Sequence, residues 1–148
     1  MNTGRNSKMR KFRTEYKGKY ALSKPRYLFL YYYILDKYPE WVAEYNSLSD
    51  TRKALKYYAD DVPPTDMSTD ATQAAAMRMA VLSRKIDMVR DAAYTAAGEI
   101  APWIIQAATH EGIGYNTLRM QENRIPCGKN KYYAARRKFY WLLSKKIW

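Results

Sequence analysis

The stretch of this sequence best suited to chemistry is IPCGKNKYYAARRKFYWLLSKK, residues 125–146. It carries seven Lys or Arg side chains and five aromatic rings, and it contains no Asp or Glu. Lys and Arg side chains attract polyanions because they displace the counterions condensed on a phosphate backbone. The segment therefore predicts a cationic binding surface rather than a catalytic centre.

Helical periodicity sorts these residues into two sides. The ring-bearing and aliphatic side is expected to pack against the helices before it: Tyr132, Phe139 and Leu143, with Tyr140 and Ile147 beside them. The roughly opposite side is cationic or small: Lys131, Ala134, Lys138 and Lys145. Such a helix is also compatible with a solvated surface, so its neighbours must decide between the two interpretations.

Those neighbours favour a helix-turn-helix. We expect a short helix at about 116–123, a turn at 124–128 with Ile125 as a buried plug, and a long helix at about 128–145. In this motif the second helix lies in the major groove and its first residues read base edges. Asn pairs with adenine and Lys donates to guanine, which suits a first turn that contains Asn130. The predicted nucleic-acid contacts are Lys129, Asn130, Lys131, Ala134, Arg136, Arg137 and Lys138 from the last helix, Arg119, Arg124 and Tyr115 before it, and Arg10, Lys11 and Arg13 near the N-terminus.

Net charge supports a polyanionic partner through its distribution. The chain of 148 residues has a formal charge of +12. Residues 1–26 carry nine Lys or Arg and one Glu, and residues 119–148 carry the same numbers, whereas residues 27–118 carry eight bases and twelve acids. Double-stranded DNA is the leading partner, and an anionic membrane surface or an acidic protein are the rivals.

The composition, together with the positions of capping residues, prolines and glycines, predicts an all-α fold in three parts. Residues 1–22 are expected to be a flexible basic arm, residues 23–98 a helical bundle, and residues 99–148 the helix-turn-helix region. Ser23 is expected to cap the first helix. Pro39 is expected to end that helix and to begin another. Gly98 is expected to cap the C-terminal end of a later, long helix.

That long helix is predicted at 71–97, with Asp70 as its cap. An apolar stripe runs along it: Ala75, Met79, Leu82, Ile86, Val89 and Ala93, widened by Met77, Val81 and Met88. The stripe fits either the core of the bundle or the seam of a homodimer through 71–97. Pro102 is expected in the first turn of the helix that follows, at about 99–110.

Enzymatic chemistry finds little support. The single histidine, His110, excludes a His-centred metal site and fits a helix C-terminus. Cys127 fits a small turn residue, and one cysteine excludes an internal disulfide. There is no phosphate-binding loop and no dinucleotide fingerprint, so no cofactor and no metal are expected.

Location follows from the same absence of signals. The longest strongly apolar run, Tyr27–Leu35, is nine residues, too short to cross a bilayer. We expect no signal peptide, because the first residues are polar and basic. We expect a cytoplasmic protein with no membrane partner.

The segment LRMQENRIPCGKNKYYAARRKFYWLLSKK resembles the C-terminal helix-turn-helix of phage late-gene regulators of the ArpU/RinA type, whose domains are similar to region four of bacterial sigma factors. The layout of about residues 20–148 is also similar to small proteins of Firmicute prophages. At the turn the chain departs from the late regulators, with Cys127-Gly128 and Lys131 where they carry a Ser cap and a Thr. The resemblance implies a transcription regulator in a bacterial host cell.

Three functions are consistent with these observations. The first is a phage-type DNA-binding transcription regulator that uses the basic helix at about 128–145. The second is a phage-encoded inhibitor of a nucleic-acid enzyme, an anti-CRISPR-like interaction protein. The third is an RNA-binding or packaging accessory protein. The implied protein partners are RNA polymerase for the first and a nuclease for the second.

Overall fold

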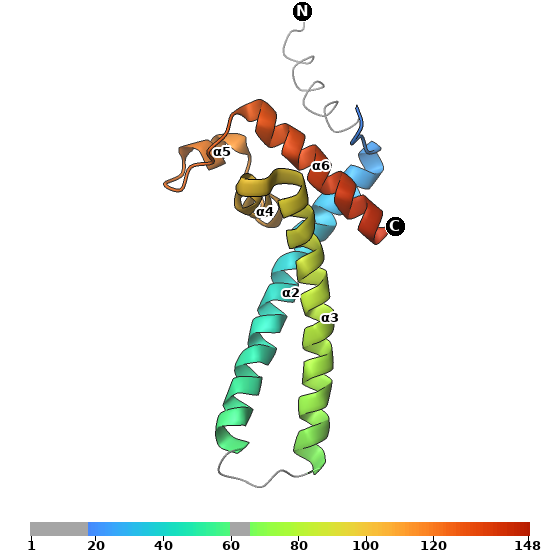
Figure 1. Cartoon of the computed structure of the whole chain (residues 1–148), viewed down its shortest axis with the longest axis vertical. Coiled ribbons are helices and arrows are strands. Elements are labelled where there is room, and N and C mark those ends of the chain that lie inside the picture. The colour runs from blue at the N-terminus through green and yellow to red at the C-terminus, as the bar shows by residue number, and fades with distance from the viewer. Residues whose placement is uncertain (1–17, 60–65) are drawn as a thin grey trace, which may run out of the picture. The chain divides into compact units, whose positions relative to one another are not determined.

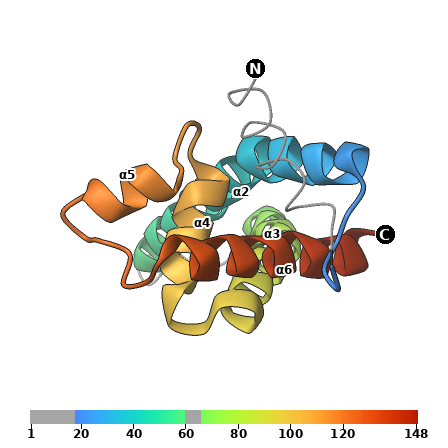
Figure 2. The same ribbon diagram turned by 90° about the horizontal axis from the view of Figure 1, so that it is seen from above.

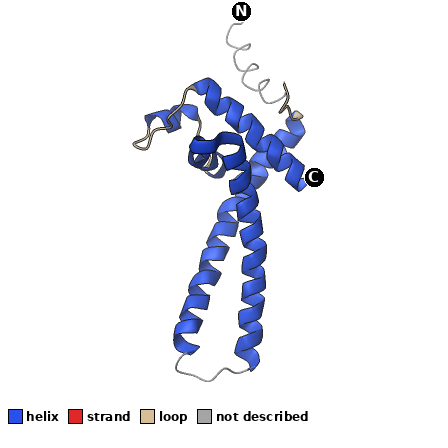
Figure 3. Cartoon of the chain, viewed as in Figure 1, coloured by secondary structure: helices blue, strands red, loops and turns tan. Residues whose placement is uncertain are grey.

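The computed structural model describes residues 18–59 and 66–148, and these residues form helices and turns without a strand (Figure 3). The helices, labelled in Figure 1, are α2 (Lys24–Ala59), α3 (Asp66–Ala97), the short 3-10 helix η1 (Gly98–Ile100), α4 (Ala101–Thr109), α5 (Tyr115–Met120) and α6 (Lys129–Ile147). The all-α prediction is confirmed for the described part of the chain. Contacts divide the chain into two compact units, residues 37–87 on the one hand and residues 1–36 with 88–148 on the other.

The unit of residues 37–87 is a helical hairpin, in which the later part of α2 runs beside the earlier part of α3 (Figure 1). Its buried side chains are Tyr38, Trp41, Leu82 and Ile86. Arg78 donates two hydrogen bonds to Glu44, from Nε to Oε1 at 2.8 Å and from Nη2 to Oε2 at 2.9 Å. This planar, two-point pairing ties α3 to α2 along an exposed flank of the hairpin.

Pro39 does not end a helix, contrary to the prediction, because α2 continues through it to Ala59. A proline inside a helix removes one hydrogen bond and costs about 3 kcal/mol. Pro39 itself is exposed, whereas Tyr38 before it and Trp41 after it are buried in the hairpin. Burial of these two rings offsets the cost of the proline. A prediction based on the proline alone does not take this burial into account.

The predicted start of the long helix was also wrong. α3 begins at Asp66, so Asp70 lies inside the helix rather than at its cap. The apolar stripe is confirmed in its later part, where Leu82, Ile86, Val89 and Ala93 are all buried within the chain. Gly98 follows the end of α3 with a φ of +55°, the left-handed conformation expected of a glycine cap.

The second unit contains the start of α2, the end of α3 and all of η1, α4, α5 and α6. Ser23 caps α2 as predicted, since its Oγ accepts a hydrogen bond from the Arg26 N–H at 3.4 Å. Pro102 lies in the first turn of α4, also as predicted. Figures 1 and 2 together show that α6 passes in front of the first turns of α2 and crosses them, and the two helices meet where Tyr27 packs edge-on against Tyr140 with centroids 5.2 Å apart.

The core of this unit is a single cluster of aliphatic and aromatic side chains from all of its helices. Its fully buried larger members are Leu30, Ile34, Val89, Ile100, Ile104, Leu118, Tyr132, Phe139, Tyr140 and Leu143. Burial raises the pKa of the Tyr140 phenol well above its usual value. α6 contributes four of these side chains, so the core fixes the rotation of α6 about its own axis.

Candidate nucleic-acid interface

The packing side of α6 is the one that the sequence predicts. Tyr132, Phe139 and Leu143 are each at most 1% exposed, and they recur at the spacing of one helix face. Ile104 of α4 and Leu118 of α5 lie in the same core. With this side anchored, the rotation of α6 decides which cations reach solvent.

The outer side of α6 is cationic from its first turn to its last. Asn130, Lys131, Ala134 and Lys145 are exposed on this side, and Arg137 and Lys138 are half-buried among them. Lys129 and Lys146 are exposed at the two ends of the helix. Gly128 precedes the helix in an extended conformation, and the first turn holds no acidic side chain. The first turn thus presents backbone N–H groups without helical partners beside two lysines, an arrangement that favours an anion.

Arg136 does not share this outer side. Its guanidinium carbon lies 4.8 Å from the ring centre of Tyr133, 5.9 Å from that of Tyr27 and 6.0 Å from that of Tyr132. Lys131, Ala134 and Lys138 lie roughly 140–160° away around the helix. The structure therefore places Arg136 between α6 and α2 as a cation held by rings, while Arg137 points about 100° further round.

A ring pair that the sequence reasoning missed sits on the outer side of α6. Trp141 packs edge-on against Tyr20 with centroids 5.1 Å apart. Lys138 Nζ lies 5.5 Å from the Tyr20 ring centre, and Lys145 Nζ lies 5.1 Å from that of Trp141. The part of the expected arm that the structure describes, residues 18–22, thus packs on α6, and Leu22 is buried. Trp141 occupies the same helix side as Ala134 and Lys145, which is the signal that sequence reasoning could have used.

The turn before α6 is held by hydrogen bonds from three directions. The Ile125 N–H donates to the Leu118 carbonyl at 3.0 Å, and Ile125 is buried as predicted. Trp103 Nε1 donates to the Asn123 carbonyl at 2.9 Å, and the Tyr115 hydroxyl donates to the Cys127 carbonyl at 3.0 Å. The turn is consequently a defined structure that sets where α6 begins.

The same turn is longer than the predicted one. α5 ends at Met120 instead of 123, because Gln121 adopts an extended backbone and its side chain pairs with Gln106 at 2.8 and 3.0 Å. Eight residues, 121–128, separate α5 from α6, against the three or four typical of a helix-turn-helix. Arg119 and Arg124 remain exposed at this end of α6. Tyr115, expected at the nucleic acid, holds the turn with its hydroxyl and packs its ring on Tyr132.

Two details limit the chemistry available at the start of α6. Lys131 Nζ lies 3.5 Å from Glu99 Oε1, and both side chains are largely exposed, so this pair contributes little and leaves the lysine able to exchange partners. Burial raises the pKa of the Cys127 thiol, which outweighs the lowering by Lys131. Cys127 is therefore poorly suited to act as a thiolate nucleophile.

Some expectations fall outside this geometry. Arg10, Lys11 and Arg13 lie outside the described residues. Across residues 18–59 and 66–148 no cluster of three or more His, Cys, Asp or Glu side chains is placed to hold a metal ion. None of the helices described combines the length and the apolarity needed to cross a bilayer.

Comparison with known proteins adds no identity. No protein-family model, no curated sequence and no solved structure matches this chain. Function is therefore inferred from the residues and their geometry.

Proposed function

We propose that the protein binds double-stranded DNA through the outer side of α6 and acts as a transcription regulator of the phage type. The observation that carries the proposal is the rotation of α6. The rings of Tyr132, Phe139 and Tyr140 are buried in the core, and lysines, an asparagine and a small alanine are exposed along the rest of the helix. A helix of 19 residues is about 28 Å long, which is enough to lie in a major groove.

Within this proposal the residues have different roles. Lys129, Asn130 and Lys131 lead into the groove, because the first turn of a recognition helix reads base edges. Arg137 and Lys138, one turn or more further on, hold phosphates. Ala134 lies between the two groups, and its small side chain permits close approach to the floor of the groove.

The longer turn alters the expected docking. Because eight residues separate α5 from α6, α5 supports α6 through the turn rather than as the tight first helix of the motif. Arg119 and Arg124 then approach the phosphates beside the start of α6. A helix-turn-helix in this extended form is part of the proposal.

The deciding experiment measures duplex binding as a function of salt. Removal of one phosphate-binding side chain lowers the slope of log K against log salt by roughly one unit. The test variant is Arg137→Ala/Lys138→Ala. Its control is Arg52→Ala/Lys53→Ala, which removes the same Arg-Lys pair from exposed positions of α2.

We expect the slope of the α6 variant to fall by about two units and the α2 variant to keep the slope of the wild type. Selection from random duplexes with the wild type then identifies a preferred sequence. Equal slopes in the two variants, or wild-type binding without any preferred sequence, would refute the proposal.

One observation favours a second candidate, an RNA-binding accessory protein. Tyr20 and Trp141 place two rings among the lysines of the outer side of α6. Bases of a single strand stack on such rings, at about 1–3 kcal/mol each. Competition between an unstructured RNA and a DNA duplex of equal length separates the two candidate functions. Only an RNA-binding protein should release the duplex in favour of the RNA, and in that case Trp141→Ala should abolish the preference for RNA.

A further inference from the structure

The first turns of α2 expose an apolar face on the side away from the core. Pro25, Phe29 and Tyr32 recur at intervals of four and three residues, Asp36 follows four residues later with a carboxylate, and all four are exposed. Phe29 is 50% exposed and Tyr32 is 61% exposed. Exposed apolar side chains that line one face of a helix are candidates for contact with a partner.

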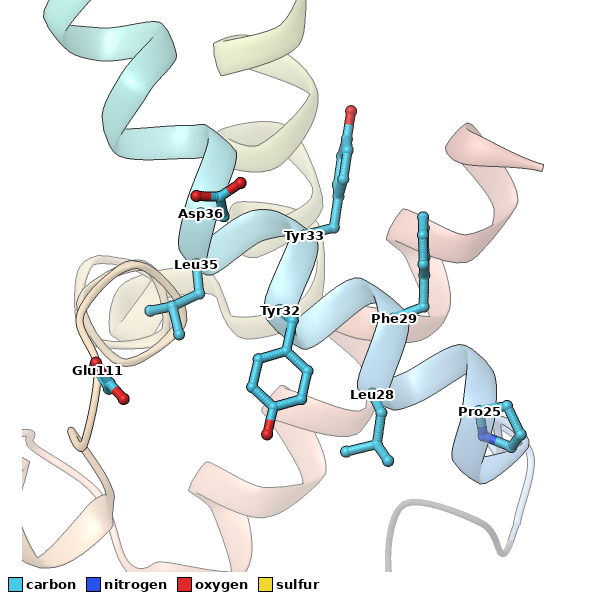
Figure 4. A pocket seen from close by; sticks show the side chains of 8 residues that line it. All are labelled: Pro25, Leu28, Phe29, Tyr32, Tyr33, Leu35, Asp36 and Glu111. Carbon is cyan, nitrogen blue, oxygen red and sulfur yellow. The ribbon is translucent and has the colours of Figure 1, made fainter.

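A shallow groove of about 830 Å³ follows this face (Figure 4). It is lined by Pro25, Leu28, Phe29, Tyr32, Tyr33, Leu35, Asp36 and Glu111. In Figure 4 the rings of Phe29 and Tyr33 stand on one side of the helix and the side chains of Leu28 and Tyr32 on the other, with Pro25 and Asp36 towards the two ends. Phe29 and Tyr33 are stacked, with centroids 5.6 Å apart and planes 12° apart, so the two rings together form one wall of the groove.

The charges at the groove select among partners. Asp36 and Glu111 both line it, and two carboxylates disfavour a phosphate backbone. Arg26 does not line the groove but lies beside its other end, next to Pro25, with its guanidinium carbon 5.2 Å from the ring centre of Trp148. The face is therefore cationic at its start, apolar in its middle and anionic at its end.

We propose that this face binds a second copy of the same chain, with the two α2 helices antiparallel about a two-fold axis. In that arrangement Phe29 of one copy meets Tyr32 of the other, and Arg26 of one copy meets Asp36 of the other, twice. In an isologous contact the same surface of both copies must be complementary to itself in the antiparallel orientation. The face of α2 meets this requirement, because its cationic and anionic ends and its two exposed rings each come opposite one another. The flanking charge pairs set the antiparallel register, as they do in coiled coils.

The size of the face predicts a weak dimer. An aromatic side chain offers about 150–250 Å² of surface, so the half-exposed Phe29 and Tyr32 contribute roughly 400 Å² from two copies. Leu28, Leu35 and Pro25 add smaller areas, so the total stays below the about 1,200 Å² at which stable interfaces begin. We expect monomers and dimers to exchange across the micromolar range of protein concentration.

The outer side of α6 stays accessible in this dimer, because α6 meets α2 through its Arg136 and Tyr140 side.

Sedimentation equilibrium of the full chain, with and without Tyr32→Lys, tests the proposal. The matched control is Tyr94→Lys, which places the same charge at a tyrosine of α3 that is 55% exposed. We expect Tyr32→Lys to raise the dimer dissociation constant at least tenfold and Tyr94→Lys to leave it unchanged. A wild type that stays monomeric throughout the micromolar range would overturn the proposal.

A charge exchange tests the register. Arg26 and Asp36 are ten residues apart, about 15 Å along α2, so they cannot pair with each other within one chain. Arg26→Glu and Asp36→Arg alone should each weaken the dimer, and the double variant should restore it. Failure of the double variant to recover, with its helical content intact by circular dichroism, would refute the antiparallel register.

A rival seam on α3 is tested in parallel. Met77 and Val81, 67% and 41% exposed, lie within the stretch 71–97 that the sequence offered as a dimer seam. Met77→Lys should leave the dimer intact under the present proposal. Dissociation by Met77→Lys but not by Tyr32→Lys would assign association to α3 and refute the face on α2. These outcomes do not depend on DNA, so they stand or fall separately from the proposed function.

Discussion

Arg136 and Arg137 are adjacent and identical, yet the structure predicts opposite consequences for their removal. The Arg136 guanidinium lies within 6.0 Å of three tyrosine ring centres, the nearest at 4.8 Å. Arg137 is turned about 100° away, towards the lysines of the outer side. Arg136→Ala should therefore cost stability, and Arg137→Ala should cost DNA affinity.

The decrease in stability follows from the ring contacts. A cation over a ring contributes about 0.5–1 kcal/mol at an exposed site and about 2 kcal/mol when desolvated. Arg136 is half-buried and its three rings share one guanidinium, so the contributions do not add in full. We expect the free energy of unfolding to fall by about 1–2 kcal/mol, which lowers Tm by roughly 2–8 °C in a chain of this size.

Thermal unfolding followed by circular dichroism measures this decrease, and fluorescence anisotropy with a labelled duplex at several salt concentrations measures the DNA contacts. For Arg136→Ala we expect a lower Tm and an unchanged salt slope. For Arg137→Ala we expect an unchanged Tm and a slope lower by about one unit. Arg136→Lys keeps the charge but lacks the planar group that stacks on the rings, so it should recover only part of the Tm.

The reverse pattern would refute this reasoning. If Arg136→Ala lowers the salt slope by about one unit and leaves Tm unchanged, its guanidinium leaves the rings for a phosphate. The rotation of α6 on which the proposed interface depends would then be wrong.

Three further predictions concern the rest of the chain. The hydrogen bonds from Arg78 lower the pKa of Glu44, so their contribution to the stability of the hairpin is complete above pH 4.5 and is lost as the pH falls through the lowered pKa. Arg78→Ala should flatten this part of the curve of Tm against pH, and an unchanged curve would contradict the pairing. Burial raises the pKa of Cys127, so its alkylation by iodoacetamide should reach half its limiting rate at a higher pH than that of a free cysteine peptide, and a lower midpoint would contradict its burial. Tyr115→Phe removes the hydrogen bond to the Cys127 carbonyl and should cost about 0.5–1.5 kcal/mol by urea unfolding, because a part-buried acceptor of the turn is left without its donor; a neutral result would mean that water replaces the hydroxyl.

Local periodicity and the positions of capping residues were enough to predict several features of the fold. Tyr132, Phe139 and Leu143 could be assigned to the packing side of α6 because their spacing is a property of the helix alone. Ser23 and Gly98 mark helix ends because capping involves only neighbouring residues. The prediction of a cationic outer side on α6 rests on the same kind of information.

Other features depend on residues that lie far apart in the chain and meet only in the folded protein. Pro39 lies within α2 because burial of the adjacent Tyr38 and Trp41 outweighs the missing helix bond. The sequence predicts both Arg136 and Arg137 as nucleic-acid contacts, and it is the fold that brings Tyr27 of α2 to the guanidinium of Arg136. The local pattern shows which side of a helix is apolar. The residues of other helices that cover the edge of this side, such as Tyr27 beside Arg136, are brought there by the fold.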